Sequence, residues 1–164
     1  MRYYWDRLQH FFVSNSRHGT HSPFVYDLAV HAIYSTSHIG TDAVRTPVDF
    51  KPVYKQLLLR ILARMQKKEL AYFEEGKDVD VLWTDLLTTE SAELIEAVRS
   101  GKLLVIHEPL RTIRSKRIWE QLMQSQEVIV SINLFHFGLL LHKAGQRKEN
   151  FCLRYPFWLF KKLH

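Results

Sequence analysis

The strongest constraint on the fold is a pair of short apolar runs separated by a predicted helix. The runs, Val79–Thr84 and Lys102–His107, have the length and the continuous apolar character of strands buried in a parallel sheet. Between them, Thr88–Ser100 is predicted to be a helix, with acidic residues near its positive end and Gly101 just after its last turn. A strand, a helix and a second strand in this order predict a right-handed crossover and a parallel α/β sheet.

The segments on either side extend this unit. Apolar residues recur at helical spacing in three earlier segments, and Ser22 followed by Pro23 is a helix-start signal for the second of them. The three predicted helices cover Trp5–Phe12, Phe24–Ile33 and roughly Pro52–Gln66, and the apolar face of the third includes Val53.

After the parallel unit come one more helix and three short strands. The helix is predicted over Ile113–Ser125, and the strands over Val128–Asn133, Gly138–His142 and Phe151–Tyr155. These strands are close enough in sequence to pair antiparallel, because a parallel crossover needs about a dozen residues or more. We therefore predict one domain, 1–164, with an N-terminal helical region (1–66) and an α/β half-sheet with a C-terminal hairpin and tail (67–164).

Composition excludes several classes of protein. A chain of 164 residues with one cysteine, Cys152, has no internal disulfide framework. The longest run without a charge, Val128–Leu141, has 14 residues and is too short to span a bilayer. Met1–Asp6 does not resemble a secretion signal. We expect a soluble, cytoplasmic protein without a membrane span.

The net charge of +6 is concentrated in two stretches. Arg99–Arg117 and Lys143–His164 each carry six basic residues and one acidic residue. Such stretches are either solvated surface or a binding surface for nucleic acid or an acidic partner. The candidate residues for contact with an anion or a partner are Arg17, Arg111, Arg114, Lys116 and Arg117.

Three parts of the sequence carry a family resemblance. They are SRHGTHSPFVYDL (Ser16–Leu28), VDVLWTD (Val79–Asp85) and the long stretch from LLVIHEPL through SINLFHFGLLLHK to ENFCLRY. The chain resembles a group of class I S-adenosylmethionine-dependent methyltransferases, which have a Rossmann-like fold. The resemblance implies that the second and third parts correspond to the fourth and fifth strands, the last helix and the terminal hairpin of that fold.

The sequence departs from this family where the methyl donor would bind. The family holds its donor on a glycine-rich loop after the first strand, with an acidic residue about 20 residues further on. Here only Gln66–Asp78, 13 residues, separates the third predicted helix from VDVLWTD, whereas one βαβ unit needs roughly 30. The donor-binding half of the fold is therefore predicted to be missing, with Leu70–Glu74 as a replacement strand beside VDVLWT.

The resemblance also suggests candidate catalytic and metal-binding residues. In metal-assisted relatives, acids at the ends of the fourth and fifth strands hold a divalent cation, and Asp85 and Glu108 stand at the matching positions. Neither is followed by further ligands, so solvated acids are the alternative. His107 is a candidate general base or, alternatively, the polar end of a strand. His18 and His21 could contribute to a zinc site, but no cysteine or acid completes it and a structural role is expected.

Taken together, the sequence predicts a shortened methyltransferase-like protein, inactive on its own and kept for an interaction. No cofactor is expected, and S-adenosylmethionine would bind only if a donor site were rebuilt or supplied by a partner chain. A homodimer or a protein partner would cover the open sheet edge. The alternatives are a basic module that binds nucleic acid or an acidic partner, and a deletion product without a function of its own.

Overall fold

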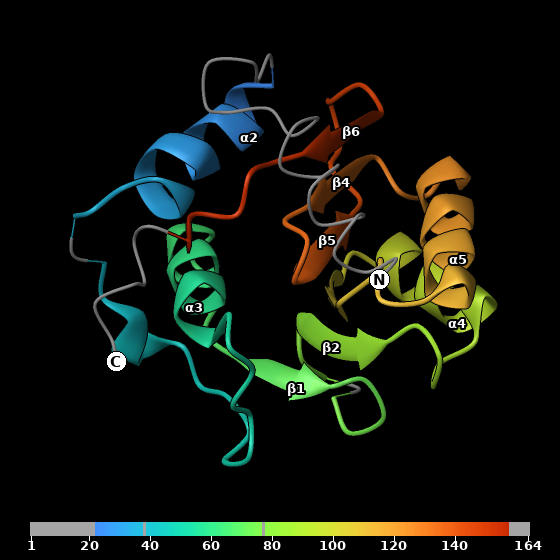
Figure 1. Ribbon diagram of the computed structural model, residues 1–164, viewed down its shortest axis with the longest axis horizontal. Coiled ribbons are helices and arrows are strands. Elements are labelled where there is room, and N and C mark those ends of the chain that lie inside the picture. The colour runs from blue at the N-terminus through green and yellow to red at the C-terminus, as the bar shows by residue number, and fades with distance from the viewer. Residues whose placement is uncertain (1–21, 38, 77, 158–164) are drawn as a thin grey trace.

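The fold is known from a computed structural model that describes residues 22–37, 39–76 and 78–157. The first predicted helix, Arg17, His18 and His21 lie outside these residues. At the centre is a six-stranded sheet in the order β1-β2-β3-β5-β4-β6 (Figure 1). The strands are β1 (Leu70–Tyr72), β2 (Val81–Asp85), β3 (Leu103–His107), β4 (Val130–Asn133), β5 (Phe137–Leu141) and β6 (Glu149–Cys152).

The sheet is mostly parallel. Strands β1, β2 and β3 are parallel neighbours, and β5 runs antiparallel between β3 and β4. The predicted hairpin of β4 and β5 is therefore confirmed. The predicted antiparallel pairing of the last strand is wrong, because β6 pairs parallel with β4. Both edges of β5 are already occupied, and β6 joins the other edge of β4, where it runs in the same direction as β4.

The helices also follow the sequence pattern closely. They are α2 (Pro23–Leu28), which continues as the π-helical turn η2 (Ala29–Ile33), the 3₁₀ turn η3 (Thr41–Ala43), α3 (Lys55–Arg64), α4 (Ser91–Arg99) and α5 (Ile113–Gln124). Ser22 is the N-cap of α2, accepting a hydrogen bond from the Val25 N–H, as its sequence predicts. Gly101 follows α4 with a φ of +90°, a left-handed conformation that glycine adopts without steric cost.

The third helix is shorter than predicted. It begins at Lys55, so Pro52 and Val53 lie in the preceding turn, where the Lys55 N–H bonds to the Pro52 carbonyl. Val53 is 82% exposed and not part of the apolar face. Helical periodicity does not apply to a residue that precedes the helix, and the buried ring of Phe50 fills the core at this end instead.

Helices cover both faces of the sheet, with α2 and α3 on one side and α4 and α5 on the other (Figure 1). Alternate strand residues supply the two cores, since successive side chains in a strand point to opposite faces. Leu103 and Val105 pack in the core beneath α3, whereas Leu104 and Ile106 pack beneath α4 and α5. The α/β fold class predicted from the sequence is confirmed.

The predicted replacement strand is confirmed as β1, and it lies beside β2 without an intervening helix. After β1 the chain returns to the start of β2 through residues 73–80, and the backbone of Gly76 lies close to the sheet. A Cβ at Gly76 would lie 2.5 Å from Leu82 Cδ2 and 2.8 Å from Ala71 Cβ. The short parallel connection therefore depends on glycine at this position.

Candidate functional site

The sequence-predicted acids and histidine meet at the carboxyl edge of the sheet. Asp85 ends β2 and His107 ends β3, and the two residues are register partners across these parallel strands. Glu108 follows directly and has a φ of +36°, an uncommon conformation for a residue other than glycine. Its N–H bonds to the carbonyl of His136 in the β4–β5 turn, 3.0 Å away, which holds this bend in place.

Arg111 lies between the two carboxylates. One guanidinium nitrogen is 2.8 Å from Asp85 Oδ2, and the other is 4.0 Å from Glu108 Oε2. The second oxygen of Asp85 accepts a hydrogen bond from the Leu87 N–H. Arg111, predicted to contact an anion, thus places one positive charge between these two acids.

The acids are not arranged as a metal site. In the part of the chain that the structure describes, no group of three or more His, Cys, Asp or Glu side chains could hold a metal ion. Asp85 and Glu108 alone would offer a hard cation too few oxygen ligands, and the Arg111 guanidinium stands between them. The residues present do not fit the divalent cation that the resemblance implies.

His107 is held by a chain of hydrogen bonds from the core. The Trp83 indole N–H donates to the Tyr54 hydroxyl over 2.9 Å, and that hydroxyl lies 2.8 Å from His107 Nδ1. With the Tyr54 hydroxyl donating to His107 Nδ1, the neutral imidazole carries its own proton on Nε2. Burial lowers the pKa of His107, which keeps the imidazole neutral at pH 7.

This arrangement limits what His107 can do chemically. A general base needs a free lone pair within reach of a substrate proton. The Nδ1 lone pair accepts from Tyr54, and the protonated Nε2 lies 4.0 Å from Glu108 Oε2. His107 is therefore arranged as a donor and as a half-buried structural group, with its ring 5.4 Å from that of Trp83.

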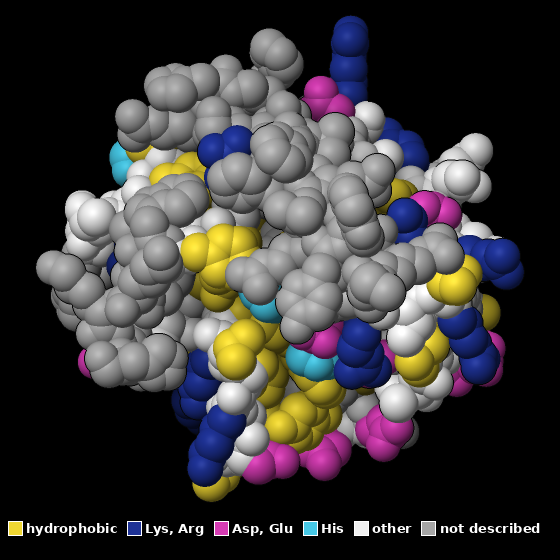
Figure 2. Space-filling view, in the orientation of Figure 1, with side chains coloured by type: hydrophobic (Ala, Val, Ile, Leu, Met, Phe, Trp, Pro, Cys, Tyr) yellow, Lys and Arg dark blue, Asp and Glu magenta, His cyan; other side chains and the backbone are white. Residues whose placement is uncertain are grey.

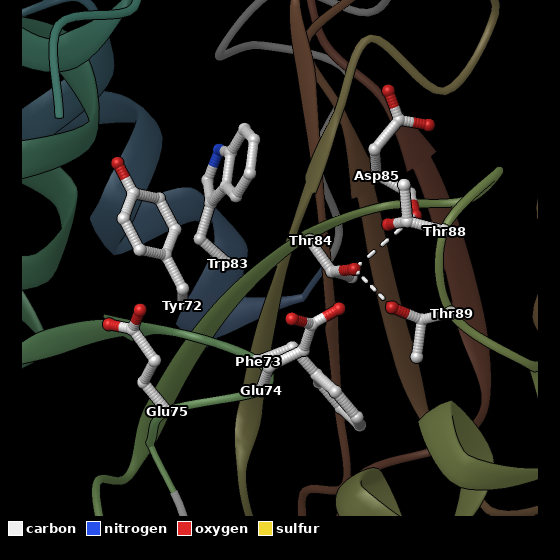
Figure 3. Close-up of a pocket in the computed structure, with 9 residues that line it drawn as sticks. All are labelled: Tyr72, Phe73, Glu74, Glu75, Trp83, Thr84, Asp85, Thr88 and Thr89. Atoms are coloured by element: carbon white, nitrogen blue, oxygen red, sulfur yellow. Dashed lines mark hydrogen bonds between the residues drawn. The ribbon is translucent and has the colours of Figure 1, made fainter. Parts of the chain in front are cut away.

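A small pocket adjoins this cluster at the carboxyl ends of β1 and β2 (Figure 3). Its volume is about 220 Å³, and Asp85 belongs both to its lining and to the ion pair with Arg111. In Figure 2, hydrophobic side chains over the β1–β2 region are bordered by acidic side chains at the lower margin of the molecule.

The residues that follow β1 do not fit the methyl-donor site that the resemblance implies. That site needs a glycine-rich turn with open space beside its backbone. Gly76, which the sequence offers in this segment, has its backbone packed against Ala71 and Leu82. Comparison with known proteins identifies no relative from which a donor site could be inferred. No family model, no curated protein and no solved structure matches this chain.

The remaining basic candidates lie on α5. Arg114 and Arg117 are exposed and Lys116 is half-buried, and none of the three forms an ion pair with a described residue. They stay candidates for contact with an anion. Among the described residues, no helix is long and apolar enough to cross a membrane.

Sequence reasoning missed three residues of this cluster. Tyr54 lies in the third predicted helix, Trp83 in the predicted strand VDVLWTD and His136 in the stretch SINLFHFGLLLHK. The sequence pattern gives none of the three a role at the site. His136 lies 3.8 Å from Glu108 Oε1 and packs edge-to-face on the ring of Tyr155. Tyr54 and His107 are 53 residues apart in the chain, so no local pattern signals their contact.

Proposed function

We propose that this chain is a methyltransferase-like α/β protein without a methyl-donor site, which acts by binding a partner and not by methyl transfer. The observation that carries the proposal is the direct return of the chain from β1 to β2 through residues 73–80. The resemblance implies a donor-binding loop, helix and further strands at this point. Methyl transfer requires donor and acceptor to be held in line, and the described residues of this segment, 73–76 and 78–80, contain no glycine-rich turn that could hold a donor.

The carboxyl-edge cluster supports the same proposal. In a metal-assisted methyl transfer the acids at Asp85 and Glu108 would have to bind a cation that polarises the acceptor hydroxyl. Here the Arg111 guanidinium lies 2.8 Å from Asp85 Oδ2 and 4.0 Å from Glu108 Oε2, between the two carboxylates that would have to bind the cation. The carboxylates of the cluster are thus engaged by a cationic side chain of the chain itself.

The first experiment is a calorimetric titration with S-adenosylmethionine and S-adenosylhomocysteine. We expect no binding heat at 1 mM ligand and no change in the thermal midpoint. A dissociation constant of 100 μM corresponds to roughly 5.5 kcal/mol of binding free energy. At 1 mM ligand it would stabilise the fold by about 1.4 kcal/mol, which a thermal melt detects. Binding tighter than 100 μM would overturn the proposal.

The edge of β1 is a surface through which a partner could bind. The start of this edge is covered by a single bridge, in which the Arg45 N–H bonds to the Lys68 carbonyl and the Leu70 N–H to the Arg45 carbonyl. Past Leu70, no described segment pairs with it. An open strand edge is a template for strand addition. Light scattering at micromolar concentration tests a homodimer, and a monomer would exclude one.

A second candidate function is the binding of nucleic acid through α5. It is favoured by Arg114 and Arg117, which lie one helical turn apart on the exposed surface and are not neutralised by a described acid. Binding of this kind weakens steeply as salt is raised. The test is a mobility shift with generic DNA and RNA at 50 mM salt. The double variant Arg114→Gln/Arg117→Gln is compared with Lys68→Gln, an exposed lysine elsewhere. An absence of any shift removes this candidate.

A further inference from the structure

The pocket at the carboxyl ends of β1 and β2 is called the β1–β2 pocket. Its lining indicates which kind of ligand it could bind. Figure 3 shows Tyr72 and Trp83 at one side, threonine side chains at the other, and Glu74 between them. Its volume of about 220 Å³ lies below the range of roughly 300–1,000 Å³ typical of drug-sized ligands. The pocket thus suits a compact ligand.

The aromatic side chains of the pocket have no donor to offer. The Tyr72 hydroxyl donates to Asp49 Oδ1 over 3.0 Å, and the Trp83 indole N–H donates to the Tyr54 hydroxyl over 2.9 Å. What the two residues present is their ring surface. The rings lie 5.5 Å apart at an angle of 72°, and their faces offer an apolar surface to an alkyl chain.

The threonine hydroxyls at the other side of the pocket supply acceptor oxygens. Thr88 donates to the Asp85 carbonyl over 2.9 Å, and Thr84 donates to the same carbonyl over 3.3 Å. Thr84 and Thr89 share a hydrogen bond of 2.6 Å between their hydroxyl oxygens, which either hydroxyl can donate. Thr84 is almost completely buried, so the hydroxyl oxygens of Thr88 and Thr89 are the ones that a ligand can reach.

The charge of the pocket is negative although the chain as a whole is basic. Its acids are Glu74, Glu75 and Asp85, and of these Asp85 is paired with Arg111. In the described ranges, neither Glu74 nor Glu75 has a basic side chain within ion-pair distance. An anionic ligand would therefore meet two carboxylates that no described basic side chain neutralises.

We propose that the β1–β2 pocket binds a compact primary alkylammonium ion. The ammonium N–H groups donate to the carboxylate and threonine oxygens, and the alkyl chain lies against Tyr72 and Trp83. The inference goes beyond the proposed function and holds whether or not the chain binds a methyl donor. A failure of one therefore leaves the other intact, because the donor titration and the ammonium titration are separate measurements.

The test is a titration with three small probes, followed by calorimetry and by amide NMR shifts. n-Butylammonium is the expected ligand, tetramethylammonium is a cation without N–H donors, and butyrate is an anion of similar size. We expect saturable n-butylammonium binding with a millimolar dissociation constant and NMR shifts centred on Thr84 and Thr89. Binding of tetramethylammonium should be at least fivefold weaker, and butyrate should not bind.

Variants locate the site. The double variant Glu74→Gln/Glu75→Gln should weaken n-butylammonium binding at least tenfold. The matched control, Glu90→Gln/Glu120→Gln, removes the same charge from exposed positions outside the pocket and should leave the affinity unchanged. Thermal melts verify that both variants fold. No saturable binding, equal binding of tetramethylammonium, or equal losses in the two double variants would each overturn the proposal.

Discussion

At the scale of single residues, the site is decided by which polar atoms satisfy one another. Arg111 neutralises Asp85, and Tyr54 fixes the proton of His107 on Nε2. Asp85 and His107 are candidate reactive residues in the sequence, but in the fold each is held by its partner and has a structural role. Carboxylate and threonine oxygens that can still accept hydrogen bonds face the β1–β2 pocket.

The neutral state of His107 predicts a pH dependence of stability. Burial lowers its pKa in the folded state, so the unfolded chain binds the proton more readily. The contribution of neutral His107 to stability is fully present above the ordinary histidine pKa of about 6.5. It is lost as the pH falls from there through the lower pKa of the folded state. The free energy of unfolding should therefore fall between pH 7 and 5.5, by at most about 1.4 kcal/mol per pH unit from this group.

Urea denaturation across this pH range checks the expectation. His107→Asn should remove this part of the slope, whereas His142→Asn, at an exposed histidine, should keep it. Equal slopes in the wild type and His107→Asn would show that His107 is not the group responsible.

At the scale of elements, two glycines permit close packing that no other residue allows. Gly76 lies against Ala71 and Leu82 in the β1–β2 connection. Gly138 in β5 lies beneath the indole of Trp119 from α5, where a Cβ would come within 2.5 Å of the ring. The first contact shortens the crossover, and the second seats α5 on the sheet.

Gly76→Ala should destabilise the protein by about 1–3 kcal/mol, the typical cost of overpacking. Backbone and strand side chains surround the added methyl group, so it cannot be accommodated by rotation of a surface side chain. The matched control is Gly40→Ala, because Gly40 has a φ of −64° and nothing within 4 Å of an added Cβ. Chemical denaturation should show little change for Gly40→Ala. Equal effects in the two variants would contradict the packing argument.

At the scale of the whole molecule, the sheet joins two apolar cores into one. Strands β2 and β3 send alternate side chains into both cores, so neither face can lose its packing without loosening the other. Leu62 lies in the core under α3 and Leu122 in the core under α5, and both are almost completely buried.

Leu62→Ala and Leu122→Ala should each lower the free energy of unfolding by about 2–5 kcal/mol. Each variant should still unfold in one transition, with coincident curves from circular dichroism and tryptophan fluorescence. Two separate transitions in either variant would show that the faces unfold independently.

The sequence by itself determined the local structure and part of the site. Continuous apolar runs predicted β2 and β3, helical periodicity and capping signals predicted α2, α4 and α5, and the short gap before Val79 predicted β1. The sequence also placed Asp85, His107 and Glu108 at one edge, since the carboxyl ends of parallel strands meet there. These features depend on neighbours within a few residues, which the sequence shows directly.

Only the tertiary structure decided the strand order and the state of the site residues. Because β5 lies between β3 and β4, β6 pairs with the other edge of β4, and it runs parallel to β4. No local sequence pattern shows that both edges of β5 are occupied. The contacts of Tyr54 with His107 and of Arg111 with Asp85 join residues 53 and 26 positions apart. Such contacts arise from how the elements pack, because burial and charge balance are properties of the assembled fold.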